Sequence, residues 1–298
     1  MRLIVGYQAT PSGADGIALG ATLARSLQAS LDICLVLPQE RPVPSKAPVE
    51  AGYDDILIDQ ATSWLAEALA LVPEDVQART HLLFDESFAQ GLLDATRSGA
   101  CGATHEHVDE CEAYMIVVGA AGDGLLGRHS IGTVTSDLLH CAHVPLALAP
   151  RGYRHSPPPR IRELTCAIGN RPGAVELVEA ATDLSASAEL PLRLLSLVSA
   201  EAESIRAPGP GGLAKAEDVL RTVKAELPAE SEVQLTVAEG SGIEKAVSSL
   251  EWHAGDVLMV GSSRLAQPHR LFLGSVAAKM LRVVPVPMIV VPREAGHE

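Results

Sequence analysis

Short apolar runs alternate along the chain with longer segments in which apolar residues recur every three or four positions. The runs predict buried strands, and the longer segments predict helices with one apolar face. In the first half the predicted strands are residues 2–6, 31–38, 76–84, 114–119 and 144–150, and the predicted helices are residues 11–29, 54–72, 86–99 and 133–140. Ser12 is expected to cap the first of these helices.

The second half repeats the same order of elements. Its predicted strands are residues 164–169, 192–198, 232–237, 257–261 and 286–292, and its predicted helices lie near residues 173–184, 213–227, 242–252 and 275–282. Strict alternation of strands and helices is typical of a parallel sheet with helices on both faces. We therefore expect an α/β protein built from two doubly wound, five-stranded parallel sheets.

A basic, proline-rich segment separates the two halves. Residues 151–160 read RGYRHSPPPR, and proline-rich stretches act as stiff spacers. The chain has 298 residues, about twice the usual length of one domain. We therefore expect a first domain at residues 1–150, a linker at 151–160 and a second domain at 161–298.

Two passages of equal length, residues 119–151 and 261–293, align with each other without gaps. The equivalent positions include Gly119 and Gly261, Arg128 and Arg270, Gly132 and Gly274, and Thr133 and Ser275. Because the repeat period is about half the chain, it indicates two copies of one domain rather than a solenoid of short repeats.

The first passage spaces its glycines as Gly119-x2-Gly122-x9-Gly132 and then enters a predicted helix. Glycine lets the backbone approach a phosphate closely, and the unpaired N–H groups at the start of a helix favour an anion. The residues expected to contact phosphate are Gly119, Gly122, Arg128, Gly132, Thr133 and Val134. The alternative is that the glycines only make tight turns between strand and helix.

This spacing resembles the ATP-binding signature of the universal stress protein family, Gly-x2-Gly-x9-Gly-Ser/Thr, and the chain resembles a tandem protein of that family. The first half fits the signature fully, whereas Arg264 replaces the second glycine in the second half. The resemblance implies ATP as the ligand, with magnesium on its phosphates, and adenine contacts from Gln8 and Val36. Gln8 stands where the family usually carries Asp, and its amide both donates and accepts hydrogen bonds. We expect unequal halves, with ATP in the first.

Three functions stay open at this point. The resemblance favours an ATP-binding regulatory protein with roles in stress tolerance and growth control and an unnamed protein partner. A weak ATPase or autokinase needs a group that orients or deprotonates the attacking nucleophile, and Asp123 and His129 lie in the right loop for that role. A scaffold that binds no nucleotide is favoured by Gln8 and Arg264.

The last predicted strand of each half, at residues 144–150 and 286–292, is apolar. Exposed edge strands of this kind tend to pair, and the resemblance implies pairing of domains through this strand. We therefore expect the two halves to form an internal pseudo-dimer with these strands as neighbours. Whether whole chains also form a homodimer stays open.

Composition narrows the partners. The formal net charge is -14 and the pI is about 5.1. An acidic surface repels nucleic acid and anionic membranes, and no apolar stretch approaches the roughly 20 residues that span a bilayer. The five cysteines are odd in number and scattered, which favours a reducing cytoplasm over a disulfide framework.

One insertion in the first half gathers soft metal ligands before the strand predicted at residues 114–119. It carries Cys101, His105, His107 and Cys111. Zinc prefers such ligands, but their spacing is no standard zinc pattern. A polar surface insertion is therefore favoured, and no metal site is predicted.

Overall fold

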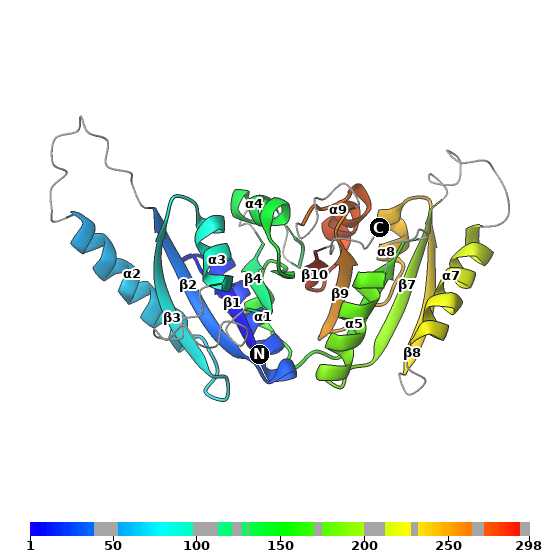
Figure 1. Ribbon diagram of the computed structural model, residues 1–298, viewed down its shortest axis with the longest axis horizontal. Coiled ribbons are helices and arrows are strands. Elements are labelled where there is room, and N and C mark those ends of the chain that lie inside the picture. The colour runs from blue at the N-terminus through cyan, green and yellow to red at the C-terminus, as the bar shows by residue number, and fades with distance from the viewer. Residues whose placement is uncertain are drawn as a thin grey trace.

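Ten strands join into one sheet in the order β3-β2-β1-β4-β5-β10-β9-β6-β7-β8 (Figure 1). The computed structural model describes residues 1–38, 53–97, 113–120, 127–129, 131–169, 175–199, 212–227, 232–263 and 271–292. Neighbouring strands within each half are parallel. This confirms two doubly wound, five-stranded parallel halves with helices between their strands.

The elements follow the expected order in both halves. The first half contains β1 (Arg2–Gly6), α1 (Pro11–Leu27), β2 (Ser30–Pro38), α2 (Tyr53–Ala70), β3 (Ala78–Asp85), α3 (Phe88–Arg97), β4 (Met115–Gly119), α4 (Thr133–Cys141) and β5 (Leu146–Ala149). A short 3-10 helix, η1 (Tyr153–His155), lies in the linker. The second half contains β6 (Glu163–Ile168), α5 (Val175–Ser187), β7 (Leu192–Ser199), α7 (Gly212–Glu226), β8 (Val233–Gly240), α8 (Ile243–Ser248), β9 (Asp256–Gly261), α9 (Ser275–Val283) and β10 (Met288–Val291).

The last strands of the two halves are neighbours, as expected. β5 and β10 pair antiparallel, with Ala147 opposite Ile289 at the centre of the contact. Both residues are fully buried. Each half therefore covers the apolar edge strand of the other, and the chain forms the internal pseudo-dimer that the sequence predicts (Figure 1).

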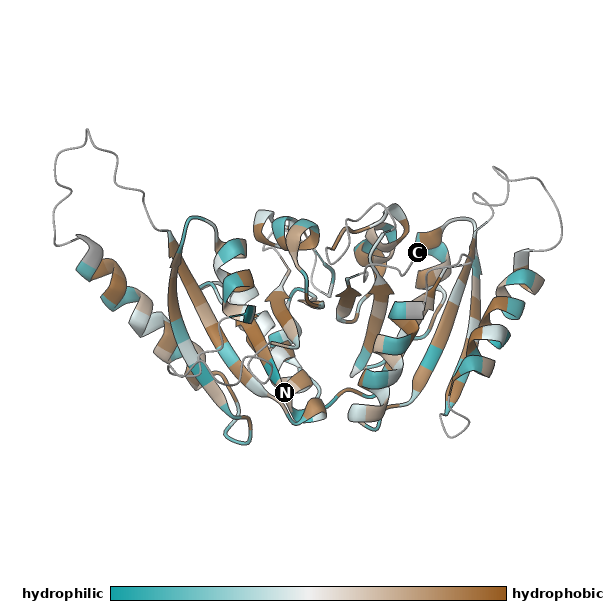
Figure 2. Cartoon of the chain, viewed as in Figure 1, coloured by the Kyte–Doolittle hydropathy of each residue, from teal (hydrophilic) through white to brown (hydrophobic). Residues whose placement is uncertain are grey.

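The core lies on both faces of the sheet because strand residues point alternately to opposite sides. In β1, Leu3 and Val5 pack on the face covered by α1, α2, α5 and α7, whereas Ile4 packs on the face covered by α3, α4, α8 and α9. Figure 2 shows the strands as the most hydrophobic part of the chain. Cys34 and Cys166 belong to this core, and burial raises the pKa of each thiol to about 12. They therefore act as small apolar residues of the core.

Two local expectations are wrong. Thr10, not Ser12, caps α1, because the Thr10 hydroxyl accepts a hydrogen bond from the Gly13 N–H at 3.2 Å. The helix expected to reach Trp252 ends at Ser248. There the indole N–H of Trp252 donates to the Val247 carbonyl at 3.2 Å, which occupies an acceptor that a further helical turn needs.

An ion pair occupies the same place in both halves with its charges exchanged. Leu3 of β1 is opposite Leu31 of β2, and Leu164 of β6 is opposite Leu192 of β7. Arg2 and Glu163 therefore hold equivalent positions, and so do Asp32 and Arg193. Arg2 pairs with Asp32 at 2.8 Å in the first half, and Glu163 pairs with Arg193 at 3.1 Å in the second.

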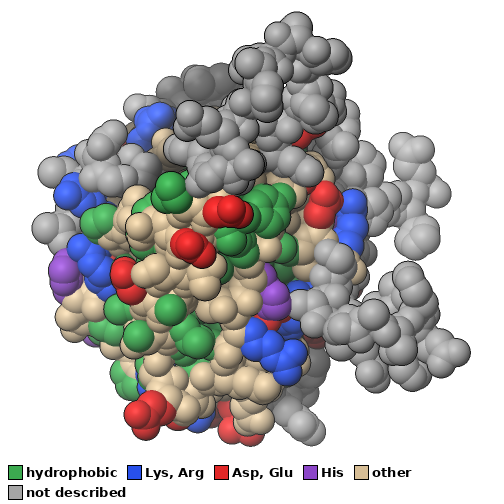
Figure 3. Space-filling view, turned by 90° about the vertical axis from the view of Figure 1, so that its left-hand side faces the viewer, with side chains coloured by type: hydrophobic (Ala, Val, Ile, Leu, Met, Phe, Trp, Pro, Cys, Tyr) green, Lys and Arg blue, Asp and Glu red, His purple; other side chains and the backbone are tan. Residues whose placement is uncertain are grey.

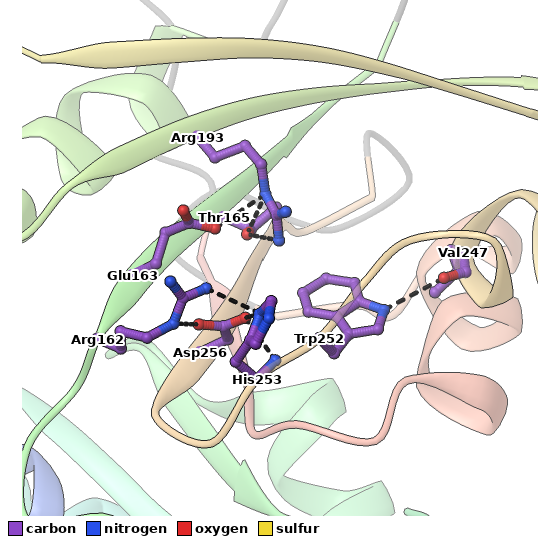
Figure 4. A network of polar contacts seen from close by, with 8 residues as sticks. All are labelled: Arg162, Glu163, Thr165, Arg193, Val247, Trp252, His253 and Asp256. Carbon is purple, nitrogen blue, oxygen red and sulfur yellow. Dashed lines mark hydrogen bonds and ion pairs between the residues drawn. The ribbon is translucent and has the colours of Figure 1, made fainter.

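A polar network surrounds Arg193 at the amino ends of the second-half strands (Figure 4). Its Nε and Nη2 donate to the Thr165 hydroxyl at 2.9 and 2.7 Å, and its guanidinium lies 5.1 Å from the centre of the Trp252 ring. Nearby, the fully buried Asp256 accepts from Arg162 Nε at 2.7 Å and from the His253 N–H at 2.8 Å. Every member faces another protein group, so we interpret the network as structural.

The outer end of the first half is formed by α2 and the edge strand β3. Figure 3 faces this end and shows hydrophobic side chains interspersed with charged ones. The exposed large apolar residues here include Ile56, Ile58, Leu69, Leu71 and Phe84. Of the helices in the described ranges, none combines the length and the apolar character required to cross a membrane.

Candidate functional site

A cavity of about 510 Å³ opens in the first half at the carboxyl ends of β1 and β4. These neighbouring strands lie where the strand order of the half reverses, which is where open parallel sheets bind ligands. The cavity wall comprises Gly6, Gln8, Thr10, Pro11, Ser12, Gly13, Asp15, Phe88, Val118, Gly119, Ala120, Gly132, Thr133, Val134, Thr135, Arg151 and Arg154.

Two helices begin at this cavity. Pro11 and Ser12 open α1, and Thr133 and Val134 open α4. The α4 N-cap is Gly132, in extended conformation and without a side chain to satisfy the first N–H groups of the helix. Free N–H groups and the positive ends of two helix dipoles favour an anion in the space between them.

A buried carboxylate holds the linker against the cavity. Asp15 is fully buried, and its oxygens accept from the backbone N–H groups of Gly152 at 2.8 Å and Arg154 at 3.0 Å. Arg154 Nη1 lies 2.9 Å from the same carboxylate. Asp15 is therefore paired with Arg154, and the other charged side chain on the described wall is that of Arg151.

Gly119 has a steric reason to be glycine. A Cβ at this position would overlap the carbonyl oxygen of Ser12, because the end of β4 packs directly against the first turn of α1. At the equivalent Gly261 the nearest atom to such a Cβ is a Leu177 side-chain atom at 3.5 Å, an ordinary contact. Close packing of β4 against α1 is therefore a reason for glycine at position 119 that is independent of phosphate binding.

The structure brings together most of the predicted site residues. Gln8, Gly119, Gly132, Thr133 and Val134 line the cavity. Gly122 lies outside the described residues.

Two predicted residues stand apart from the described cavity wall. Val36 is buried, and a Cβ at Gly91 of α3 would lie 2.8 Å from one of its methyl groups. The carbonyl of Arg128 accepts from the Arg151 N–H at 2.9 Å. Contacts of Val36 with adenine and of Arg128 with phosphate stay predictions.

Sequence reasoning missed several residues of the wall, namely Asp15, Phe88, Thr135, Arg151 and Arg154. The two arginines were visible only as the basic charge of the linker. The place of Arg154 depends on its bonds to Asp15, 139 residues earlier, and Arg151 precedes Gly152, whose N–H donates to the same carboxylate. Phe88 is the first residue of α3, where an aromatic ring after a strand is the signal that could have pointed to it.

His129 does not line the cavity. Its Nε2 lies 2.9 Å from the Val286 carbonyl oxygen in the second half, and burial lowers the pKa of the imidazole to about 4. The other hydrolysis candidate, Asp123, lies outside the described residues. On the described cavity wall, the one side chain that could serve as a general base is Asp15, whose oxygens already accept hydrogen bonds from Gly152 and Arg154.

Metal ligands do not cluster in the described ranges, since no group of three or more His, Cys, Asp or Glu residues there could hold an ion. Cys101, His105, His107 and Cys111 lie outside those ranges.

Comparison with known proteins extends over nearly the whole chain. Residues 161–292 match the model of the Universal stress protein family. Universal stress proteins of Mycobacterium tuberculosis and Mycobacterium bovis are each 28% identical to the chain over 308 aligned positions, covering 98% of this chain and 100% of theirs. The matched half is the one in which Arg264 interrupts the glycine spacing, so the likeness rests on more than the glycines.

Solved structures share the fold. A universal stress protein from Archaeoglobus fulgidus superposes with a TM-score of 0.65 at 14% identity, covering 98% of both chains. A putative universal stress protein from Pseudomonas aeruginosa gives a TM-score of 0.57 at 18% identity, covering 98% of this chain and 93% of the other. The tandem arrangement of two halves therefore recurs in proteins of this overall size.

Proposed function

The chain belongs to the universal stress protein family, and from this premise we propose that it binds ATP in the first-half cavity and acts as a regulatory protein. Family membership supports a role in the response to stress. The main support for nucleotide binding is the cavity of about 510 Å³ at the switch point of the sheet. Two helix N-termini and two arginines surround it. Its volume lies within the range of about 300–1,000 Å³ that small-molecule sites occupy.

The chemistry of the wall suggests an orientation for ATP. The phosphates belong beside Gly132 and Thr133, where the first N–H groups of α4 and the Thr133 hydroxyl are available. The base belongs toward Phe88 and Val118, which supply apolar surface. Gln8 then lies at the cavity with an amide that suits the polar edge of adenine.

Magnesium fits this proposal as a companion of the phosphates. Asp15 is the carboxylate on the described wall, and its oxygens already accept hydrogen bonds from the linker. Magnesium commonly binds through phosphates and water rather than through an all-protein cage. When bound, it neutralises phosphate charge.

A regulatory role is favoured over turnover because His129 is buried between the halves. ATP then acts by its different affinity for two states of the protein. We place the protein in the cytoplasm, where ATP and a protein partner are available. A scaffold without nucleotide stays the alternative.

Nucleotide released from freshly purified protein tests the proposal. The protein is denatured, and the supernatant is analysed by anion-exchange chromatography. We expect an adenine nucleotide at up to about one per chain, or, if purification strips it, saturable ATP binding by the same preparation. Absence of both would favour the scaffold.

A further inference from the structure

We propose that Arg151 and Arg154 of the linker bind the phosphate chain of the ligand, so that the segment joining the two halves is itself part of the nucleotide site. The inference rests on the proposed function and deepens it. It assigns to the cavity a ligand with two or more linked phosphates, and it makes the linker responsive to that ligand.

Arg154 is held in place at the cavity. Its Nη1 donates to Asp15 Oδ1 at 2.9 Å and to the Pro11 carbonyl at 3.1 Å, beside the first turn of α1. Its hydrogen bonds to the described residues all use Nη1 or the backbone nitrogen, which leaves Nε and Nη2 for a ligand. The side chain is 31% exposed, although its partner Asp15 is 1% exposed. A guanidinium that is already fixed by other bonds binds phosphate well because it loses little rotamer entropy on binding.

Arg151 connects the linker to the glycine-rich loop. Its N–H donates to the Arg128 carbonyl at 2.9 Å, and its carbonyl accepts from the Gly127 N–H at 2.8 Å. Residues 127 and 128 belong to the connection from β4 to α4, which carries the predicted signature. A ligand that contacts Gly127 or Arg128 therefore also acts on the backbone of Arg151.

The linker is fixed along α1 by a row of buried polar residues. Asp15, Thr22 and Ser26 are spaced by seven and four positions, so they lie on one side of the helix. Thr22 Oγ1 donates to the Pro158 carbonyl at 2.9 Å, and Ser26 Oγ accepts from the Ile161 N–H at 2.8 Å. All three residues are buried. Phosphate bound at Arg154 therefore adds to a set of bonds that runs from the cavity to the start of the second half.

Isothermal titration of ATP, AMP and adenosine tests the inference. Arg154→Gln and Arg151→Gln should each weaken ATP binding by about tenfold or more, the range for a lost charge-assisted hydrogen bond. Adenosine binding should change less than about twofold, and the salt dependence of ATP binding should fall. Arg160→Gln is the matched control, because Arg160 is a linker arginine on the wall of a different cavity.

Arg154→Gln also removes the cation beside buried Asp15, so its unfolding temperature is measured too. If that variant unfolds, Arg151→Gln decides the question, and its unfolding temperature is measured in the same way. ATP binding by the wild type, unchanged in both variants, would overturn the inference and leave the proposed function standing. If the wild type binds inorganic tripolyphosphate but not ATP, and both variants lose tripolyphosphate binding, the result would support the arginine site and contradict the proposal that the ligand is a nucleotide. Equal loss of adenosine and ATP would overturn a phosphate contact.

Discussion

His129 Nε2 lies 2.9 Å from the carbonyl oxygen of Val286, which precedes β10 in the opposite half. Leu271 occupies the position of His129 in the second passage, and its N–H donates to the Ala142 carbonyl of the first half at 2.9 Å. The segment before α4 and the segment before α9 therefore each reach across the β5–β10 junction (Figure 1). These two hydrogen bonds therefore join the halves at the segments that precede α4 and α9, in addition to the β5–β10 pairing.

The buried imidazole predicts a pH-dependent stability. Burial lowers the pKa of His129 in the folded protein to about 4, whereas an unfolded histidine titrates near its ordinary value of about 6.5. Burying the neutral imidazole therefore carries no protonation penalty above about pH 6.5. As the pH falls from there toward about 4, the unfolded state gains a proton that the folded state does not, and the free energy of unfolding decreases. The loss amounts to at most about 3 kcal/mol.

His129→Leu copies the residue that the second half uses and should remove this part of the pH dependence. Urea unfolding at pH 7 and pH 4.5 measures it. Identical losses of unfolding free energy in wild type and variant would show that His129 is accessible to protons in the folded state.

Gly119→Ala should destabilise the protein, and Gly261→Ala should not. The first Cβ would overlap the Ser12 carbonyl, whereas the second makes an ordinary contact with Leu177. We expect a loss of about 1–3 kcal/mol or more for the first variant and less than about 0.5 kcal/mol for the second. Equal unfolding midpoints of the two variants would contradict the packing of β4 against α1.

Arg193→Lys should cost about 1–2 kcal/mol, although it keeps the charge. The ammonium group of lysine cannot make the two bonds that Arg193 Nε and Nη2 donate to Thr165. It also lacks the planar guanidinium that lies over the Trp252 ring. Arg221→Lys on the surface of α7 is the control and should change stability by less than about 0.5 kcal/mol, because its pair with Glu217 is exposed. Tryptophan fluorescence measures the unfolding and also responds to the loss of Arg193 beside Trp252. An Arg193→Lys variant with unchanged stability and unchanged emission would contradict the network in Figure 4.

The sequence predicts the sheet well because most of its inner strands, such as β1 and β4, are short apolar runs that the local pattern reveals. It also predicts the β5–β10 pairing, since both strands are apolar and end their halves. The predicted end of α8 is wrong, because the indole N–H of Trp252, which lies beyond the helix, donates a hydrogen bond to the Val247 carbonyl.

The cavity is predicted only in part. The glycine spacing locates Gly119, Gly132 and Thr133, because these three residues belong to one short stretch of the sequence. Arg154 could not be found in this way, because its place depends on Asp15, 139 residues earlier. Gly119 is required for packing that no local pattern shows.

The central claim is that the first-half cavity binds ATP, and the matched glycines Gly132 and Gly274 test it most directly. Both are N-caps in extended conformation, so valine causes no backbone strain at either. Only Gly132 lines the described cavity. Isothermal titration with ATP and magnesium should give about one site per chain, weakened at least tenfold, or about 1.4 kcal/mol, by Gly132→Val and unchanged by Gly274→Val. Two equal sites, or a loss caused by Gly274→Val alone, would contradict the assignment.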